Sequence, residues 1–224
     1  MAQKGAEVKN ELHLIDCMDY LKNCGDNEFD LAIVDPPYGI GVNNNIGRRR
    51  GEKQSGNKKF TWDNKTPDKI YFDELFRISK NQIIWGGNYF TNFLYNSRCW
   101  IYWRKLMGVD FSDGELAWTS FNKVVKEFTF CPKAGSSIHP TQKPVALYKW
   151  LLQNYAKPGD RILDTHSGSG SLRIACHDLG FDLVSCELDP DYYRDNENRF
   201  QRHIKQAELF APAEIQKYVY QGKL

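Results

Sequence analysis

The chain has 224 residues, of which 41% are hydrophobic and 26% charged, with a formal net charge of +2. These values are ordinary for a globular protein, exclude a polycation, and predict a single domain over residues 1–224. No apolar run approaches the ~20 residues of a membrane span, and residues 1–10 are polar and lack a signal-peptide pattern. We therefore expect a cytoplasmic protein with no membrane partner.

The six cysteines are scattered along the chain and include no Cys-x-x-Cys pair. This spacing argues against a zinc ribbon and against a disulfide framework. Most of the cysteines are expected to be small buried side chains. No metal site is predicted.

Short apolar runs alternate with segments of helical period, which predicts an α/β fold built on a mostly parallel sheet. The expected strands are residues 11–15, 30–34, 81–85, 99–103, 115–121, 126–131, 160–164 and 182–187. The expected helices are residues 16–23, 69–79, 88–94, 143–156, 171–180 and 190–207. The strands at 115–121 and 126–131 are joined by a short polar connection, and we expect them to form an antiparallel hairpin at a sheet edge.

The segment Asp35-Pro36-Pro37-Tyr38 directly follows the apolar run Leu31–Val34. Two consecutive prolines stiffen the backbone, and they continue neither a strand nor a helix in the normal way. At one strand end, a carboxylate and backbone carbonyls can accept hydrogen bonds from an amino group. The ring that carries this amino group can then stack on the aromatic side chain. A plain turn explains the four residues equally well when they are considered alone.

Residues 39–64 have no hydrophobic period and are rich in Gly, Asn, Arg and Lys. A long loop of this kind is usually functional or disordered. Because it directly follows Tyr38, we predict a flexible basic loop that contacts nucleic acid, with a solvated loop of no particular role as the alternative. The candidate DNA-binding residues are Arg48, Arg49, Arg50, Lys53, Lys58 and Lys59.

A second constellation covers residues 160–171, where a strand ends at Asp164 and a Gly-x-Gly turn precedes a helix. Gly168 and Gly170 allow a tight turn and a close approach of a ligand to the backbone. The next strand ends at Glu187, where a carboxylate can accept hydrogen bonds from ribose hydroxyls. Position 173 is arginine rather than the third glycine of a dinucleotide fingerprint, which favours another adenosine-bearing cofactor. A structural turn with a surface acid is the alternative.

Together these motifs resemble the DNA amino-methyltransferases that use S-adenosylmethionine, in particular small members from phages or prophages. Asp35, Pro36, Pro37 and Tyr38 look like the catalytic motif of that family. The catalytic motif precedes the cofactor loop, which is the permuted, β-type order. The resemblance covers about residues 11–205 and implies a Rossmann-like methyltransferase fold with helices on both faces of the sheet.

The resemblance also implies a set of cofactor-binding residues. The segment from His139 to Pro144 looks like the one that precedes the cofactor loop in the family, and Asp16 matches an acid near the adenine of the cofactor. The implied residues are Asp16, His139, Thr141, Lys143, Asp164, Thr165, Ser167, Gly168, Gly170 and Glu187. Position 166 departs from the family pattern, because His166 stands where phenylalanine is usual.

The implied reaction is methylation of the N6 amine of adenine in a flipped-out base of DNA. Aspartate at position 35, where cytosine-N4 enzymes commonly have serine, favours adenine. Methylation at cytosine C5 is disfavoured because the family of enzymes that performs it needs a nucleophilic cysteine in a Pro-Cys motif. Residues 60–135 are expected to contribute to target recognition.

Alternatives to this reading remain open at the level of sequence. Cytosine N4, an amine of RNA or an amine of a protein could be the acceptor, because a fold does not determine its substrate. A nucleic-acid-binding module that has lost catalysis is a further alternative, although Asp35 and Tyr38 are intact. The resemblance is compatible with a homodimer.

Overall fold

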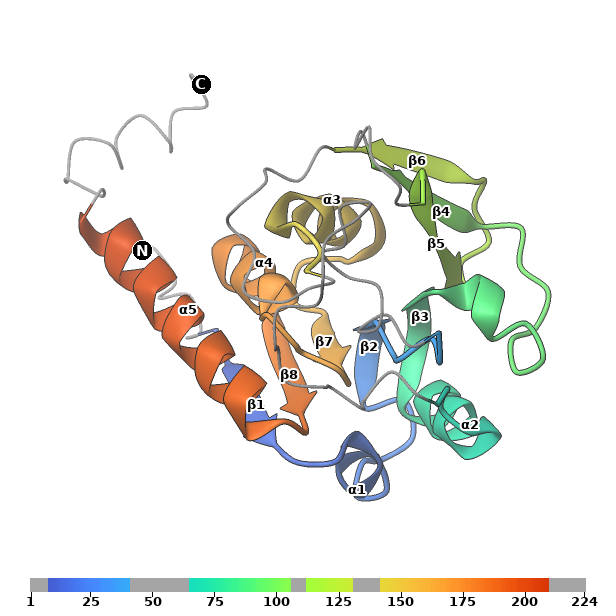
Figure 1. The fold of residues 1–224 in the computed structure, drawn as a ribbon, viewed down its shortest axis with the longest axis horizontal. Coiled ribbons are helices and arrows are strands. Elements are labelled where there is room, and N and C mark those ends of the chain that lie inside the picture. The colour runs from blue at the N-terminus through green and yellow to red at the C-terminus, as the bar shows by residue number, and fades with distance from the viewer. Residues whose placement is uncertain (1–7, 41–64, 106–111, 131–141, 210–224) are drawn as a thin grey trace, which may run out of the picture.

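The computed structural model describes residues 8–40, 65–105, 112–130 and 142–209. These residues form one eight-stranded sheet, and helices cover both of its faces (Figure 1). The strands are β1 (Asn10–Leu14), β2 (Phe29–Val34), β3 (Ser79–Trp85), β4 (Trp100–Arg104), β5 (Gly114–Thr119), β6 (Lys126–Thr129), β7 (Arg161–Asp164) and β8 (Asp182–Glu187). The α-helices are α1 (Cys17–Leu21), α2 (Lys69–Ile78), α3 (Val145–Tyr155), α4 (Ser171–Leu179) and α5 (Pro190–Leu209).

The strand order is β1-β8-β7-β2-β3-β5-β4-β6, and every neighbouring pair is parallel except β3–β5 and β4–β5. Strand β5 is therefore the one antiparallel strand among the eight. The predicted α/β class with a mostly parallel sheet is confirmed. Strands β2 and β7 are neighbours in the sheet. The strand that follows β2 in the chain, β3, lies on the side of β2 away from β7, and the strand that follows β7, β8, lies on the side of β7 away from β2.

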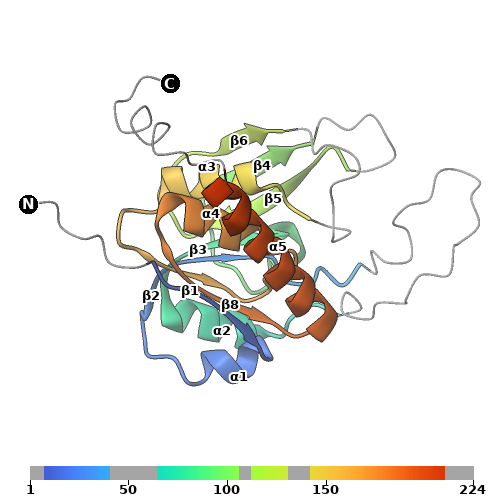
Figure 2. The ribbon, with the colours of Figure 1, turned by 90° about the vertical axis from the view of Figure 1, so that its left-hand side faces the viewer.

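Figure 2 shows α3, α4 and α5 on one side of the sheet and α1 and α2 on the other. The alternation of side chains along each strand supplies both layers, because successive residues point to opposite faces. On β2, Leu31 and Ile33 join the core under α3 and α4, whereas Ala32 and Val34 join the core under α1 and α2. Burial on both faces explains why the parallel strands appear in the sequence as continuous apolar runs.

One sequence prediction about the later strands is wrong. The predicted hairpin between 115–121 and 126–131 does not form, because β4 lies between β5 and β6 and pairs with both. The antiparallel hairpin joins β4 to β5 instead. The polar connection at 120–125 signals a change of direction, but it does not specify the partner strand.

The predicted helix at 88–94 is also wrong, since the structure has a short 3₁₀ helix, η2 (Gly87–Tyr89), followed by turns. The backbone of this segment makes turn-type hydrogen bonds, such as the one from Phe93 N to the Phe90 carbonyl at 2.8 Å, and tertiary contacts hold it against the sheet. The Trp118 indole donates a hydrogen bond to the carbonyl of Tyr95 at 2.9 Å, and Phe90 is fully buried. None of the helices in the described part of the chain combines the length and apolar character that a membrane span requires.

Candidate functional site

Four acidic residues follow four adjacent parallel strands, at the same edge of the sheet. Glu187 and Asp164 end β8 and β7, while Asp35 follows β2 and Asp16 follows β1. Open α/β sheets bind ligands at this carboxyl edge, where chain connections diverge to the two sides. That divergence lies between β2 and β7, so Asp35 and Asp164 stand on either side of it.

The segment Asp35–Tyr38 forms neither helix nor strand, and Asp35 is tied to two neighbours. The Tyr38 hydroxyl donates a hydrogen bond to Asp35 Oδ1 at 2.6 Å. The Lys143 ammonium, which is only 2% exposed, forms a short ion pair with Asp35 Oδ2. Both oxygens of the Asp35 carboxylate are therefore oriented by the protein.

Lys143 belongs to a chain of alternating charges that crosses the site. Its ammonium lies 3.1 Å from Glu115 Oε2, and Glu115 Oε1 pairs closely with Lys105. Burial by itself lowers the pKa of Lys143, but the flanking carboxylates of Asp35 and Glu115 outweigh it and raise that pKa. Lys143 is thus held as a buried cation beside Asp35.

Glu115 and Lys105 were missed in the sequence analysis. Burial raises the pKa of Glu115, yet Lys143 and Lys105 together bring it below its ordinary value. The only sequence signal was an acidic residue at the start of the apolar strand β5, which is a weak one. The partners lie on different strands and on the segment before α3, so their proximity follows from the tertiary fold.

Aromatic rings surround the Tyr38 side chain. Tyr38 stacks on Tyr89 with ring centroids 5.0 Å apart, and Phe90 meets it edge-on at 6.1 Å. Gly86 has φ +69°, and a Cβ atom there would overlap the Tyr38 ring. Glycine at position 86 therefore allows both the turn after β3 and the position of Tyr38. No sequence motif assigns Tyr89 or Gly86 to the site.

The loop between β7 and α4 folds against β8 and α5. Ser167 N donates to the carbonyl of Cys186 at 2.9 Å, and Gly168 N donates to Glu187 Oε2 at 2.8 Å. Asn196, fully buried on α5, donates to Ser167 Oγ at 2.9 Å and to the Gly168 carbonyl at 3.2 Å. The loop and Glu187 are thus held as one unit.

Thr165 and Asp16 extend this unit in opposite directions. Thr165 Oγ1 lies 2.7 Å from the hydroxyl of Tyr71 on α2, within hydrogen-bond distance. Asp16 caps α1 by accepting a hydrogen bond from Met18 N at 2.8 Å, and Ile15 N donates to the Glu187 carbonyl at 2.9 Å. Asp16, Glu187 and the loop therefore lie along one stretch of the sheet edge.

Burial shifts the pKa of two neighbouring groups in the loop. It raises the pKa of Asp164 to about 7, with a further increase from the Asp35 and Glu187 carboxylates. It lowers the pKa of His166 to about 4. Burial disfavours the charged form of each group, so the neutral forms are favoured near pH 6.

These shifts predict a pH-dependent difference between the wild type and Asp164→Asn. Asp164 keeps its proton up to about pH 7 in the folded chain but loses it near its ordinary value of 3.8 when unfolded. The folded state binds the extra proton between these values, so this group adds stability at low pH and loses it as pH rises through 7. Urea unfolding from pH 4 to 8 measures this effect. The free energy of unfolding of the wild type should increase relative to that of the variant as pH falls.

The comparison with a variant is needed because His166 acts in the opposite direction. As pH falls, His166 takes up a proton near pH 6.5 in the unfolded chain but only near pH 4 in the folded chain. The contribution of His166 to stability is therefore lost as pH falls from 6.5 toward 4. The asparagine retains the acceptor for His166 N, which lies 3.1 Å from Asp164 Oδ1. A constant difference in unfolding free energy across this pH range would contradict the assignment.

Several predicted site residues lie outside the described residues. These are Arg48, Arg49, Arg50, Lys53, Lys58 and Lys59 of the basic loop, together with His139 and Thr141. Of the segment that precedes α3, Lys143 is described, and its partners are Asp35 and Glu115.

A comparison with protein families identifies the chain. Residues 84–198, just over half of its length, match the N6/N4 DNA methylase family. The chain belongs to this family. The match includes Lys143, Asp164–Gly170 and Glu187, and begins after Asp35–Tyr38.

Known proteins similar to this methylase include the type II methyltransferase M.HpaI of Haemophilus parainfluenzae. The two are 24% identical over 225 residues, which cover 77% of the methylase and 68% of M.HpaI. The M1.HpyAVI–SAM complex is 16% identical with a TM-score of 0.58, covering 84% and 98% of the two chains. The cytosine-N4-specific PvuII DNA methyltransferase is 14% identical with a TM-score of 0.60, covering 86% and 87%. These likenesses confirm the methyltransferase fold.

Proposed function

We propose that this methylase transfers a methyl group from S-adenosylmethionine to the N6 amine of adenine in DNA. The observation that carries the proposal is the oriented Asp35 carboxylate beside the divergence of the sheet. Asp35 directly follows β2, and Asp164 ends the neighbouring strand β7. Membership in the N6/N4 family supports an exocyclic amine as the acceptor.

The residues at the carboxyl ends of β7 and β8 suit the cofactor. Glu187 accepts backbone N–H bonds from Gly168 at Oε2 and from Asp189 at Oε1, and a carboxylate with about four lone pairs has acceptor capacity left for ribose hydroxyls. Gly168 and Gly170 present backbone without side chains at the loop. When bound, S-adenosylmethionine supplies an electrophilic methyl group on sulfur. The cofactor of the M1.HpyAVI complex supports this assignment.

The groups around Asp35 are proposed to position the acceptor amine and to stabilise its charge. The Asp35 carboxylate and the Pro36 carbonyl are proposed to accept the two amine hydrogens, which turns the nitrogen lone pair toward the methyl donor. Positioning of reactants in this way can supply much of a rate enhancement. The carboxylate also stabilises positive charge that grows on the nitrogen, and can accept the proton that the nitrogen releases. The target base must leave the duplex for these contacts to form, and Tyr38 is proposed to stack on it.

The proposed role of Lys143 is to position Asp35 rather than to bind the cofactor. Its ammonium contacts both Asp35 and Glu115, and lies 3.3 Å from the Tyr38 hydroxyl. We expect Lys143→Met to lower kcat by about 10–100-fold, because Asp35 loses an oriented partner in a desolvated site. The dissociation constant for S-adenosylmethionine should change little, and Lys143→Arg should restore part of kcat.

The control for this prediction is Lys105→Met, which removes the outer cation of the same charge chain and leaves the Asp35 pair in place. It should lower kcat less than Lys143→Met. Equal losses of kcat and cofactor affinity in Lys143→Met would return Lys143 to a cofactor-binding role.

The basic segment after Tyr38 is proposed to contact DNA phosphates near the flipped base. Replacing Arg48, Arg49 and Arg50 with glutamine should weaken DNA binding and reduce its dependence on salt, because fewer counterions are released. Titrations at several salt concentrations measure the slope. Cofactor affinity should be unchanged, and an equal loss of it would contradict this role.

The acceptor base is tested by digesting methylated DNA to nucleosides and identifying the product by mass spectrometry. N6-methyldeoxyadenosine is the expected product. Exclusive N4-methyldeoxycytidine would overturn the choice of base but keep the amine chemistry, and the fold similarity to the cytosine-N4-specific PvuII enzyme makes this the second candidate. Structured RNA as a competing acceptor tests the choice of DNA.

Two further proposals concern assembly and target recognition. Residues 60–135 are proposed to contribute to reading the DNA sequence, and the active form is proposed to be a homodimer. Swapping 65–105 for the matching segment of a relative tests the first through the methylated sites. Light scattering at assay concentrations tests whether the active form is a homodimer. A monomer with full activity would contradict the proposed dimer.

A further inference from the structure

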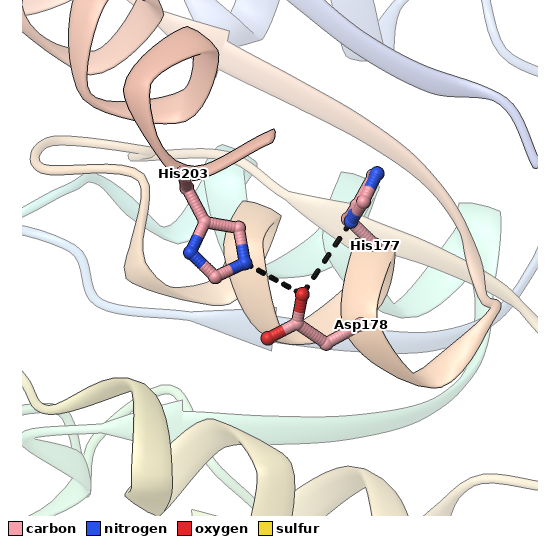
Figure 3. A group of neighbouring side chains, drawn as sticks. All are labelled: His177, Asp178 and His203. Carbon is pink, nitrogen blue, oxygen red and sulfur yellow. Dashed lines mark hydrogen bonds and ion pairs between the residues drawn. The ribbon is translucent and has the colours of Figure 1, made fainter. Parts of the chain in front are cut away.

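A group of metal-ligand side chains lies on the helical layer, outside the site described above. It consists of His177 and Asp178 near the end of α4 and His203 on α5 (Figure 3). One potential ligand atom from each residue lies within 4.8 Å of the others. Figure 3 shows both imidazoles directed at the Asp178 carboxylate.

The individual contacts are short and converge on one oxygen. His203 Nε2 lies 2.6 Å from Asp178 Oδ1, and His177 Nδ1 lies 3.4 Å from the same atom. Coordination bonds of 2.0–2.2 Å in a tetrahedral shell keep ligand atoms about 3.3–3.5 Å apart. Small side-chain rotations would therefore bring the three atoms into such a shell.

We propose that His177, Asp178 and His203 bind one divalent transition-metal ion of the zinc class. Two imidazole nitrogens and one carboxylate oxygen suit Zn²⁺, Co²⁺ or Ni²⁺, whereas Mg²⁺ and Ca²⁺ prefer oxygen ligands. Three protein ligands leave a fourth position for water. The side chains are accessible enough for this, since His177, His203 and Asp178 are 35%, 30% and 19% exposed.

The groups around the cluster favour an organised site. The other Asp178 oxygen, Oδ2, pairs with Lys149 of α3 at 2.7 Å, and outer partners of this kind orient a ligating carboxylate. The Phe200 ring packs edge-on against His177 at 5.4 Å, which restricts the imidazole. Lys149 also brings a positive charge near the ion, which limits the affinity.

Metal binding requires the hydrogen bond between His203 and Asp178 to break. In the metal-free chain this bond joins His203 Nε2 to Asp178 Oδ1, whereas a bound ion needs a lone pair from each of the two atoms. The proton on Nε2 therefore moves to Nδ1 in a neutral ring, or is released to solvent from a charged ring.

The consequence of binding is a link between α4 and α5. Helix α5 also carries Asn196 and Arg199, which hold the Gly168 carbonyl at 3.2 Å and the Ser169 carbonyl at 2.7 Å. An ion that ties α5 to α4 therefore stabilises the support of the 165–170 loop. It takes no part in methyl transfer, so this site and the proposed function stand or fall separately.

The test uses full-length protein without a polyhistidine tag, treated with chelator and titrated with Zn²⁺ by calorimetry. We expect one ion per chain, and a loss of at least about tenfold in affinity for His203→Gln and Asp178→Asn. The matched control is His13→Gln, because His13 is also a surface histidine paired with a carboxylate, that of Glu11 at 3.3 Å. It should bind as the wild type does.

Two further readouts keep the result decisive. Zn²⁺ should raise the melting temperature of the wild type and not that of His203→Gln, or of His177→Gln if the first variant fails to fold. Co²⁺ should give a spectrum without thiolate charge transfer, since no cysteine belongs to the cluster. Unchanged affinity in folded variants, a thiolate band, or no saturable binding would overturn the proposal.

Discussion

Asp35→Asn is expected to reduce methyl transfer by about 10²–10³-fold while S-adenosylmethionine still binds with nearly wild-type affinity. Loss of one preorganised charge contact at a reacting centre has an effect of this size. An amide is neutral and has one acceptor oxygen instead of two, so Lys143 and the target amine would have to share that oxygen without the charge of a carboxylate. Single-turnover assays with labelled cofactor measure the rate, and calorimetry measures cofactor binding.

The matched control for Asp35→Asn is Asp30→Asn on β2, the strand that ends just before Asp35. Asp30 pairs with Lys80 at 2.6 Å and accepts from Arg161 N at 2.9 Å, well away from Tyr38. It should keep the rate. Because breaking a buried ion pair destabilises a fold by about 3–5 kcal/mol, the unfolding of both variants must be measured as well. Undiminished methylation by a folded Asp35→Asn would refute the assignment of Asp35.

Gly170→Ala is expected to lower cofactor affinity strongly and to destabilise the chain. Gly170 has φ +73°, which costs about 1–2 kcal/mol for a residue with a side chain. A Cβ atom there would also overlap the Asn196 side chain, which holds the 165–170 loop. The loop must shift, so we expect at least a tenfold rise in the dissociation constant, about 1.4 kcal/mol.

Gly180→Ala separates the two causes. Gly180 ends α4 with φ +75°, almost the angle of Gly170, but a Cβ atom there would meet nothing within 4 Å. This variant should lose about the same stability from backbone strain and keep its cofactor affinity. Equal cofactor affinity in the two alanine variants would mean that Asn196 does not act through the loop.

Local sequence pattern predicted the strands of the parallel sheet well. Burial on both faces requires continuous apolar residues, and each run ends at a polar or turn residue that marks the sheet edge. The positions of Asp35, Asp164 and Glu187 at strand ends therefore follow from the sequence without the strand order. Helix α2 followed from Tyr71, Phe72, Leu75 and Ile78 at helical spacing.

Pairing between strands was less predictable. The polar turn before β6 was compatible with a hairpin, but β6 pairs with β4 because the sheet offers a parallel partner there. Residues 88–94 have a helical pattern of aromatic side chains, yet burial of Phe90 and the hydrogen bond from Trp118 favour turns. In both places long-range contacts outweigh local preference.

By itself, the sequence determined the α/β class, the order of the two motifs and the acids at the strand ends, because these depend on local period and turn chemistry. Only the tertiary structure decided which side chains meet. Lys143 reaches Asp35 across 108 positions, and His203 reaches Asp178 across 25. Such contacts depend on strand order and helix packing, which bring together residues whose separation along the chain carries no signal of proximity.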